Sequence, residues 1–414
     1  NDFTISFGEN GGIQFHNKKQ HSNWTVTLVD TGLKSKTGSR ISRIRDFIGQ
    51  EDFMLTYGDG VSDINIKKLV EFHYSHNKIL TVTGVRPPGR FGEMMCDPSG
   101  KIQEFNEKPQ ATAGRISSGY FVASPRLFDY LNDNYQASNT LGYNNARDIM
   151  YSIIDIKDGN QLTGVYSGYT ITLDLSQDPS TNAYEQGINC EHTWPQSLGA
   201  GSEPMKSDMH HLFPTKSNVN SSRGNDPFDE SADSETDKWY RNDYYIQTLP
   251  TEFIDEYAEK FNPPNQEDER FEPREEQKGN TARAMFYFYT IYVDVATEDY
   301  WNLQDETLID WHFYDLPDAI EINRTNTIFS YQGNVNPYVS DPSLVGRVFL
   351  VSEGVLPGDV NQDNTLDIID VVMDIGYIIG NISLNQSETI IADINYDLSL
   401  DVLDVVSIVD IVLD

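Results

Sequence analysis

The sequence lacks several features that would assign a protein to a class at once. It has only two cysteines in 414 residues, Cys96 and Cys190. This count excludes a disulfide-rich framework, and because the two lie in different blocks no disulfide between them is expected. No run of about eighteen apolar residues occurs, so we expect no membrane-spanning helix. The chain opens on Asn1-Asp2 without a methionine or a signal-peptide pattern. We therefore expect the natural N-terminus to lie outside this sequence.

Basic residues are scarce, and their scarcity is uneven. The chain has 30 Lys+Arg against 64 Asp+Glu, a formal net charge of −34. Residues 1–133 carry 16 basic and 15 acidic residues, 134–354 carry 14 and 37, and 355–414 carry 0 and 12. A shift from neutral to strongly acidic composition indicates a domain boundary, and the length suits about two to four domains. The sequence therefore predicts a multidomain protein with boundaries near residues 133 and 354.

A glutamate beside a histidine, Glu191-His192, is the strongest chemical signal, and Asn220 and Arg223 follow about thirty residues later. Carboxylate and amide oxygens are hard ligands suited to Mg²⁺ or Ca²⁺. An imidazole titrates near neutrality and can take a proton from an attacking water. A bound metal can stabilise the charge that grows on a phosphate and its leaving oxygen. These residues predict metal-assisted phosphodiester cleavage.

Three segments in this order resemble the secreted endonuclease I family, whose catalytic unit is a ββα-metal (His-Me) finger. They are residues 191–197 (EHTWPQS), 207–214 (SDMHHLFP) and 220–225 (NSSRGN). Further similarity spans about 134–352, and it is found at 142–151, Trp311-His312, Glu321, Arg324 and 332–338.

The resemblance implies roles for individual residues. Glu191 and Asn220 would be metal ligands, most simply for Mg²⁺, and His192 would be the general base. His210 and Arg223 would complete the catalytic set, while His211 stands where many members carry Asn, which leaves its role open. The implied activity is sequence-nonspecific hydrolysis of DNA, with RNA as a second polymer.

Patterns within residues 134–354 predict local structure around this site. We expect a helix near 144–155, strands between 162 and 173, Glu191-His192 on or just after a strand, and Asn220 on a helix. The acidic stretch 226–237 predicts a solvated loop. Aromatic side chains are expected in the core rather than as base-stacking platforms: Tyr240, Tyr244, Phe286, Tyr287 and Phe288.

The net charge of this block, −23, opposes binding of a polyanion unless basic residues converge on the cleft. Arg223, Lys206 and Lys216 are the nearest in sequence. Metal neutralisation, with weak binding and fast turnover on long polymers, fits this charge better than tight nonspecific binding.

Residues 24–131 alternate between apolar runs and one helical pattern. Strands are expected at 25–29, 53–56 and 79–83, and a helix at 65–76, which together predict a doubly wound α/β segment. Asp59, in the Gly-Asp-Gly turn after the second strand, lies where open α/β sheets bind ligands.

This first block resembles glucose-1-phosphate cytidylyltransferase through residues 57–63, 85–92 and 105–109. The resemblance implies that Asp59 would hold Mg²⁺ and that Gly92, Glu107 and Lys108 would contact the sugar. The glycine-rich loop that cradles the nucleotide phosphates and the second metal aspartate are both missing. We therefore expect a truncated, catalytically silent segment. A gene fusion or an assembly error would each produce such a chain.

The last sixty residues repeat a calcium-loop pattern at an offset of 34 and resemble type I dockerin. Oxygen-bearing side chains fill loop positions 1, 3, 5, 7, 9 and 12, and position 7 can also offer its backbone carbonyl. They are Asp359, Asn361, Asp363, Thr365, Asp367 and Asp370 in the first loop, and Asp393, Asn395, Asp397, Ser399, Asp401 and Asp404 in the second. Gln362, Asn364, Tyr396 and Leu398 replace the usual loop glycines, which puts ordinary affinity and cohesin recognition in question.

Together these patterns predict a truncated α/β nucleotidyltransferase segment, an α+β nuclease with a ββα-metal finger, and a small α-helical calcium-binding dockerin-like domain. The leading function is a secreted, divalent-metal-dependent endonuclease, with a cohesin-like partner for the tail and no membrane insertion. The first block resembles a cytoplasmic enzyme. Two alternatives remain: nucleotide-sugar synthesis by residues 1–133, and a non-enzymatic calcium-dependent attachment protein.

Overall fold

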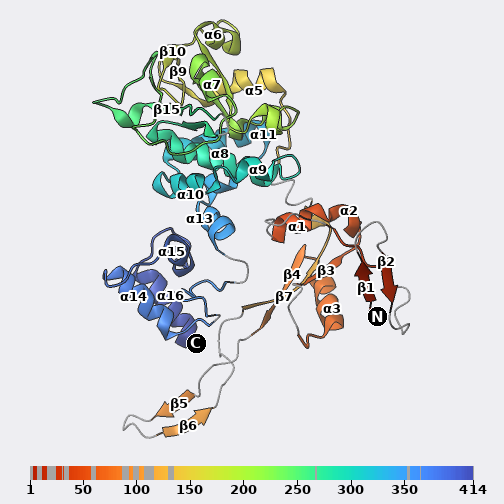
Figure 1. Ribbon diagram of the computed structural model, residues 1–414. Helices are drawn as coiled ribbons and strands as arrows, with labels where there is room; N and C mark the ends of the chain where they lie inside the picture. Colours follow the sequence, from red (N-terminus) through yellow and green to blue (C-terminus); the bar gives the residue numbers. More distant parts are fainter. Residues whose placement is uncertain are drawn as a thin grey trace. The chain divides into compact units, whose positions relative to one another are not determined.

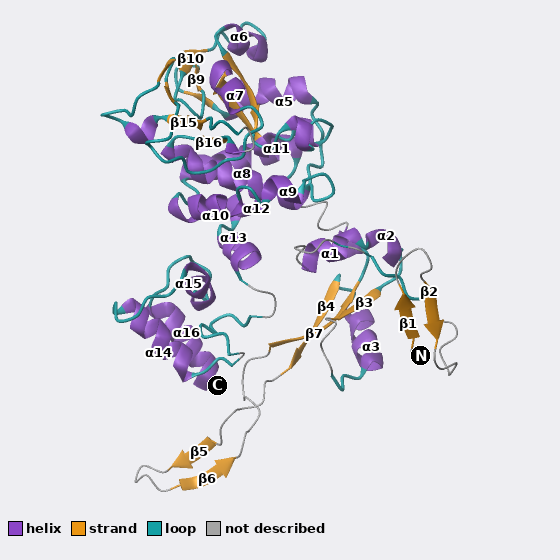
Figure 2. Cartoon of the chain, viewed as in Figure 1, coloured by secondary structure: helices purple, strands orange, loops and turns teal. Residues whose placement is uncertain are grey.

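Figures 1 and 2 show the computed structural model of the chain, coloured by sequence and by secondary structure. The described residues are 3–6, 12–15, 25–29, 31, 37–56, 62–85, 93–96, 102–106, 116–128, 135–265, 268–351, 355–363 and 365–413. The chain divides into two compact units, Asn1–Phe47 and Ile48–Asp414. The boundaries expected near residues 133 and 354 stay predictions. No helix in the described ranges is long and apolar enough to cross a membrane.

Residues 1–47 contain one antiparallel strand pair, β1 (Phe3–Ser6) with β2 (Gly12–Phe15), and the helix α1 (Thr37–Arg43). The strand predicted at 25–29 is wrong, because these residues adopt no regular structure. Val26 and Leu28 are 67% and 74% exposed, so the apolar run that suggested a buried strand is not buried.

Among its described residues, the next part of the chain contains a small antiparallel sheet and not the doubly wound arrangement predicted from the sequence. Its strands follow the order β3-β7-β4, with β7 antiparallel to both neighbours. The elements are α2 (Arg45–Ile48), β3 (Phe53–Thr56), α3 (Ile66–His76), β4 (Leu80–Val85), β5 (Glu93–Cys96), β6 (Ile102–Asn106) and β7 (Ile116–Ala123). The Asn65 side chain caps α3 by accepting a bond from the Lys68 amide at 3.0 Å, which explains where this helix starts. The predicted strands at 53–56 and 79–83 and the helix at 65–76 are confirmed.

Residues 135–351 begin with the helix predicted near 144–155, which is α5 (Tyr143–Ile149) continued by a π-helical turn, η1 (Met150–Ile154). A three-stranded antiparallel sheet follows, in the order β10-β9-β8. Its strands are β8 (Ile156–Lys157), β9 (Gln161–Thr163) and β10 (Thr170–Thr172), followed by α6 (Pro179–Glu185). The strands predicted between 162 and 173 are therefore confirmed.

A strand pair and a short helix follow. The strand β11 (Ile188–His192) pairs antiparallel with β12 (Leu212–Lys216), and α7 (Ser217–Arg223) starts directly after β12. The connection between the strands contains three 3-10 turns, η2 (Gln196–Leu198), η3 (Met205–Ser207) and η4 (Met209–His211). Glu191 and His192 thus end a strand, and Asn220 lies on a helix, as predicted.

The remaining elements of this part are a four-stranded sheet and a group of helices. The sheet has the order β14-β13-β15-β16. Its strands and the adjoining 3-10 turns are β13 (Lys238–Arg241), β14 (Tyr244–Ile246), η5 (Ile254–Glu256), β15 (Ala258–Phe261), β16 (Arg270–Glu272) and η7 (Glu275–Gln277). The helices are α8 (Lys278–Ile291), α9 (Glu298–Trp301), α10 (Asp305–Tyr314), α11 (Ala319–Gln332), α12 (Pro337–Ser340), α13 (Ser343–Val345) and η8 (Gly346–Leu350).

The main hydrophobic core centres on α8, which lies between the strands and α10 in the view of Figure 1. Ten of its residues are buried, as in a helix that packs on most of its sides. Trp194, from the connection after β11, stacks on Phe288 with ring centroids 4.9 Å apart. Such a pair adds about 0.5–1.5 kcal/mol beyond its burial, so it fixes this connection to α8.

The aromatic residues expected in the core are buried there, with one exception. Tyr240 and the three consecutive aromatic residues of α8 belong to the main core, whereas Tyr244 is 42% exposed on the sheet's edge strand β14. The expectation of a solvated loop at 226–237 is also wrong in part. Phe228 is fully buried, and Asp226 forms an ion pair with Lys260.

The tail consists of three helices, α14 (Ile368–Ile378), α15 (Gln386–Ala392) and α16 (Val402–Leu413). Helices α14 and α16 begin within the two loop repeats, so the tail is α-helical, as predicted. The Asp367 and Asp370 side chains cap the first turn of α14 reciprocally.

One buried histidine of the core predicts how stability changes with pH. His312 is fully buried, its Nε2–H donates to the Pro342 carbonyl at 2.9 Å, and its Nδ1 has no partner. Burial lowers the pKa of His312 from 6.5 to about 3. A lowered folded-state pKa means that the stability is present above the unfolded pKa and is lost as pH falls. At about pH 5 His312 alone should cost the fold roughly 2 kcal/mol relative to neutral pH.

The measurement is urea unfolding of the full chain at about pH 7.5 and pH 5, for wild type and His312→Gln. Gln keeps an N–H donor for the carbonyl and does not titrate, so this variant should lose less stability on acidification. An equal loss in both proteins would contradict the assignment.

Candidate functional sites

The end of β11 and the helix α7 bring three polar side chains together. Side chains alternate along a strand, so Asn189 and Glu191 lie on the same face of β11. The Asn220 amide nitrogen donates to Asn189 Oδ1 at 2.9 Å and to the Cys190 carbonyl at 3.1 Å. Both amide hydrogens are thereby used, and the Asn220 amide oxygen makes no hydrogen bond within the described residues.

Glu191 is buried, with 1% of its surface exposed. Its Oε1 accepts a bond from the Tyr166 hydroxyl at 2.9 Å and lies 3.3 Å from Arg223 Nη1. Burial raises the pKa of Glu191, while Arg223 and Tyr166 oppose this shift. Both contacts end on one oxygen, so Oε2 stays without a hydrogen bond in the described part of the chain. A buried carboxylate with one oxygen anchored and the other open is suited to a cation.

His192 is held as a neutral imidazole. Its Nε2 lies 3.1 Å from the Lys206 carbonyl oxygen. A carbonyl only accepts, so Nε2 carries the proton and Nδ1 carries the lone pair. The Gln196 amide approaches Nδ1 at 3.3 Å. Burial is the largest cause that lowers the pKa of His192 to about 3. At neutral pH the ring is therefore an unprotonated base.

His210 and His211 point to different places, although they are adjacent. Successive residues of a 3-10 turn such as η4 diverge by about a third of a turn. His211 Nε2 donates to the Met205 carbonyl at 2.6 Å, and its ring centroid lies 5.4 Å from that of His192. His210 Nε2 instead donates to the Asn334 carbonyl at 3.1 Å. The described contacts bring His211 to His192 and direct His210 to the Asn334 carbonyl, so a catalytic role of His210 stays a prediction.

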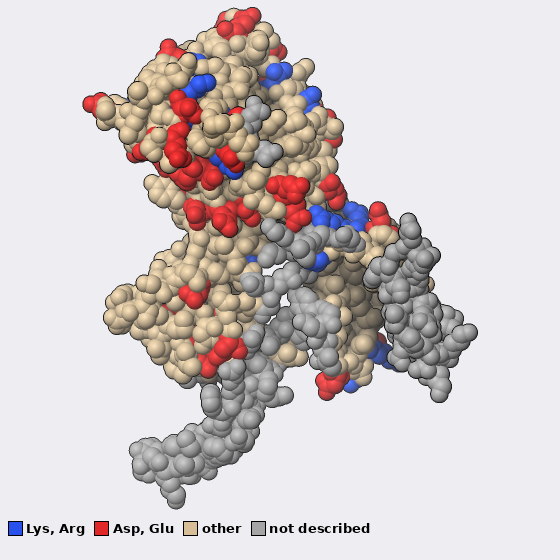
Figure 3. All heavy atoms as spheres, viewed as in Figure 1, with Lys and Arg blue, Asp and Glu red and all other residues tan. Residues whose placement is uncertain are grey.

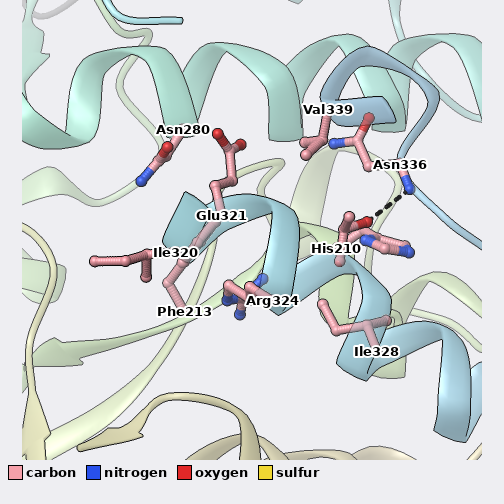
Figure 4. A pocket seen from close by; sticks show the side chains of 10 residues that line it. His210, Phe213, Asn280, Ile320, Glu321, Arg324, Ile328, Asn336 and Val339 are labelled. Atoms are coloured by element: carbon pink, nitrogen blue, oxygen red, sulfur yellow. Dashed lines mark hydrogen bonds between the residues drawn. The ribbon is translucent and has the colours of Figure 1, made fainter. Parts of the chain in front are cut away.

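His210 lines a small cavity of about 60 Å³, shown in Figure 4. Two charged residues of α11 share this lining, and both are already paired. Glu321 accepts two bonds from Arg283 Nε, each 2.8 Å, and Arg324 binds Asp155 at 2.7 and 3.1 Å. The charges beside this cavity therefore serve the packing of α11.

Arg223 has a positioning role. It is 1% exposed and donates to the His192 carbonyl at 3.3 Å, the Thr193 carbonyl at 2.8 Å and the Tyr300 hydroxyl at 2.9 Å. The guanidinium thus holds the end of β11 and the Glu191 carboxylate at the same time. This network leaves the side chain buried, and the place of Arg223 in the catalytic set stays a prediction.

Several residues of this site were not identified from the sequence. Asn189 could have been found, because it lies two residues before Glu191 on the same strand face. Gln196 lies four residues after His192 in the sequence and could have been suspected as its partner. Tyr166 comes from a loop 25 residues upstream, and no local pattern points to it.

Comparison with known proteins decides the family. A family model described as Endonuclease I matches residues 123–343, which is more than half of the chain. The chain belongs to the endonuclease I family. It is also similar to the extracellular ribonuclease of Bacillus subtilis, with 29% identity over 178 residues, covering 39% of this chain and 54% of that protein.

The start of this endonuclease I family member matches a second family. A Nucleotidyl transferase model matches residues 9–161. Glucose-1-phosphate cytidylyltransferase of Salmonella typhi is 39% identical over 134 residues, covering 32% of this chain and 51% of that protein. The chain thus spans about half the length of the curated relatives it matches. The solved structure of HddC from Yersinia pseudotuberculosis is 25% identical, covers 23% of this chain and 42% of its own, and superposes with a TM-score of only 0.16.

The nucleotidyltransferase residues predicted from the sequence, Asp59, Gly92, Glu107 and Lys108, lie outside the described residues. Of the two cysteines, Cys190 is a free, buried thiol, and burial raises its pKa to about 12. Such a thiol is unreactive at neutral pH, because the thiolate is the reactive form.

Metal ligation is tested by the side chains present. Within the ranges described above, no three His, Cys, Asp or Glu side chains are arranged to hold a metal ion. The Glu191–Asn220 pair supplies only one such side chain and one amide oxygen. That set still suits Mg²⁺, which keeps several waters and takes one or two protein carboxylates together with substrate phosphate oxygens.

The two tail loops adopt the same hydrogen-bonded geometry. Asp359 Oδ1 accepts from the Asp363 amide and Asp393 Oδ1 from the Asp397 amide, each at 3.1 Å. The last residue of each loop, Asp370 or Asp404, accepts from two loop amides at 3.3 and 2.9 Å. All four carboxylates are buried, and residues 355–414 contain no Lys or Arg. Buried carboxylates that converge in a loop fit a cation.

The replaced loop glycines keep the backbone that glycine favours. Gln362, Tyr396 and Leu398 have φ of 54°, 62° and 70°. Each such residue costs roughly 1–2 kcal/mol, so the loops keep their turn at an energetic cost.

Proposed function

We propose that residues 134–354 are a divalent-metal-dependent endonuclease that hydrolyses phosphodiester bonds of DNA, and of RNA, without sequence specificity. The observation that carries this proposal is a neutral, buried imidazole, His192, adjacent to a carboxylate and an amide oxygen left open for a cation. The sequence of the family and the extracellular ribonuclease relative support nucleic acid as the substrate.

The residues have distinct tasks in this proposal. His192 Nδ1 takes the proton of the attacking water, and the Lys206 carbonyl keeps the other ring nitrogen protonated. Glu191 Oε2 and Asn220 Oδ1 hold Mg²⁺, while Tyr166, Arg223 and Asn189 fix their orientation. When bound, Mg²⁺ supplies charge stabilisation for the phosphate and the leaving oxygen.

The segment β11–β12–α7 is the proposed ββα-metal finger. It is an antiparallel strand pair followed by a helix, and it carries one proposed ligand on β11 and the other on α7. This crossing explains how ligands 29 residues apart serve one ion.

Residues 355–414 are proposed as a dockerin-like calcium-binding domain with a cohesin-like protein partner. Buried carboxylates that recur in two loops of the same hydrogen-bonded geometry support calcium. A protein partner is supported by exposed apolar side chains that recur at the repeat offset: Ile368 and Val402 are each 61% exposed, and Ile369 and Leu403 are 51% and 60% exposed. Secretion is proposed for the nuclease and the tail, in line with the extracellular relative.

Two other functions compete with this proposal. The 39% identity to a cytidylyltransferase favours nucleotide-sugar synthesis by residues 1–133 as a rival activity. A calcium-dependent attachment protein with an inactive nuclease body is the non-enzymatic alternative.

One preparation of the full chain tests all three. It is incubated with supercoiled plasmid DNA or with RNA, in Mg²⁺ or in EDTA, and separately with CTP and glucose 1-phosphate. We expect both polymers to be cut only in Mg²⁺ and no CDP-glucose to form. Absence of cleavage under every metal condition would sink the nuclease proposal, and CDP-glucose that disappears in Asp59→Ala would promote the rival.

A further inference from the structure

The nuclease part has few basic side chains left for a polyanion. Of the fourteen Lys and Arg residues in 134–354, nine form ion pairs with carboxylates. These are Arg223, Arg241, Lys260, Arg270, Arg274, Lys278, Arg283, Arg324 and Arg347. On the face of this part that Figure 3 shows, acidic side chains form several patches and basic side chains appear at only a few points.

Five basic residues of these described ranges form no ion pair with a carboxylate. They are Arg147, Lys157, Lys206, Lys216 and Lys238. A surface with net charge −23 repels a nucleic acid except where such free cations gather. The place where these five residues gather is therefore the place where a nucleic acid can bind.

Two of the five meet beside His192. Arg147, on α5, lies with its guanidinium carbon 4.5 Å from the centre of the Tyr143 ring, and Lys206 Nζ lies 5.3 Å from the same centre. The Tyr143 ring centroid is in turn 5.4 Å from that of His192. Arg147 and Lys206, about sixty residues apart in the sequence, thus both lie against the Tyr143 ring, which itself neighbours the proposed base.

Lys206 is connected to the base in a second way. Its backbone carbonyl accepts the His192 Nε2–H bond, while its ammonium lies over Tyr143. Arg147 is partly ordered as well, because its Nη2 donates to Asn144 Oδ1 at 2.7 Å. Its Nε is buried without a partner. The cations are therefore held in place before any substrate arrives, which lowers the ordering cost of binding.

We propose that Arg147 and Lys206, held against Tyr143, bind the phosphates of the nucleic-acid backbone next to the bond that is cut. The inference rests on the proposed nuclease function and assigns its substrate-binding residues. We call this pair, Arg147 and Lys206, the phosphate clamp. Phosphate contacts carry no sequence information, so the clamp suits a nonspecific nuclease. The clamp also explains how a domain with a net charge of −23 can bind a polyanion. The acidic surface repels nucleic acid elsewhere, and the two cations bind its phosphates at the site.

The test compares Arg147→Ala, Lys206→Ala and the double variant with Lys238→Ala in the full chain. Lys238 also forms no ion pair with a carboxylate of the described ranges, but it lies over Tyr245 on the separate sheet that contains β13. Lys206→Ala keeps the backbone carbonyl that anchors His192. We expect each clamp variant to raise KM roughly tenfold with kcat nearly unchanged. The slope of log(kcat/KM) against log[salt] should become shallower by roughly one for each cation removed. Lys238→Ala should match wild type.

Binding of a fluorescent oligonucleotide in EDTA, followed by anisotropy, separates the clamp from the catalysis. The clamp variants should lose affinity and salt dependence there too, and Arg147→Lys should restore the salt slope if charge is what matters. Clamp variants with the KM, affinity and salt slope of Lys238→Ala would overturn the inference, even if His192→Ala is inactive. Absence of cleavage by wild type, with binding still dependent on Arg147 and Lys206, would instead overturn the proposed function alone.

Discussion

His192→Ala should abolish nucleic-acid cleavage while leaving the fold nearly intact. The ring is buried, is unprotonated at neutral pH and has its tautomer fixed by the Lys206 carbonyl, so its Nδ1 is available as a base. Removal of a general base typically costs about 10²–10⁴-fold in rate. The measurement is kcat on plasmid DNA in saturating Mg²⁺, with far-UV circular dichroism of the same protein.

The comparison with the phosphate clamp makes this prediction sharper. Loss of His192 should appear in kcat, whereas loss of Arg147 or Lys206 should appear in KM, because the first acts on the water and the others on the bound backbone. Glu191→Gln should instead raise the Mg²⁺ concentration needed for half-maximal rate, because it removes a charged ligand. A purified His192→Ala enzyme that keeps more than about a tenth of the wild-type rate would refute the general-base assignment.

The sequence predicted the local frame of this site because that frame is encoded locally. The strand ending at His192 and the helix carrying Asn220 follow from short patterns, and both occur as expected. The direction of neighbouring side chains does not follow from such patterns. The resemblance gave His210 a role and left that of His211 open, and the 3-10 turn η4 directs His211 to His192. In so tight a turn, adjacent residues point in different directions, so a shift of one residue changes which histidine faces His192.

Long-range contacts explain the other differences. The resemblance placed Arg223 in the catalytic set, and its donors go to backbone carbonyls and to Tyr300, which is 77 residues away. Phe228 lies in an acidic stretch, and only the tertiary fold reveals that it is buried against the Arg223 guanidinium at 4.5 Å. The apolar run at 25–29 has the composition of a strand, and it fails because strand formation requires a neighbour with which to pair.

In the tail, the repeat pattern identifies the loop residues but does not identify the buried residues between the loops. Asp374 belongs to neither loop, yet it is fully buried on α14 and both of its carboxylate oxygens lack a partner. Burial, and then the charges of Asp370 and Asp404, raise the pKa of Asp374 to about 7. The second repeat has the apolar Ile408 at the equivalent position. The interior of the tail therefore holds more carboxyl groups than the loop pattern alone suggests.

Calcium should convert the tail from a loosely ordered segment into a stable domain. Five carboxylates are buried there, at Asp359, Asp370, Asp374, Asp393 and Asp404, and no Lys or Arg lies in residues 355–414 to offset their repulsion. A domain of this size buries little core, so ligand binding has to contribute much of its stability. A cation at a hundred times its dissociation constant adds about 2.7 kcal/mol per site.

Hydrogen–deuterium exchange of the full chain measures this effect in place. We expect amides of α14 and α16 to exchange rapidly in EGTA and to become protected in millimolar Ca²⁺, while amides of α8 in the nuclease core change little. Asp359→Ala and Asp393→Ala should each lose part of the protection, because each removes the first ligand of one loop. Val372→Ala, a change at an exposed apolar site on α14, is the control that should respond like wild type. Exchange that is identical with and without Ca²⁺ would refute the calcium assignment, since the buried carboxylates would then be stable without a counter-ion.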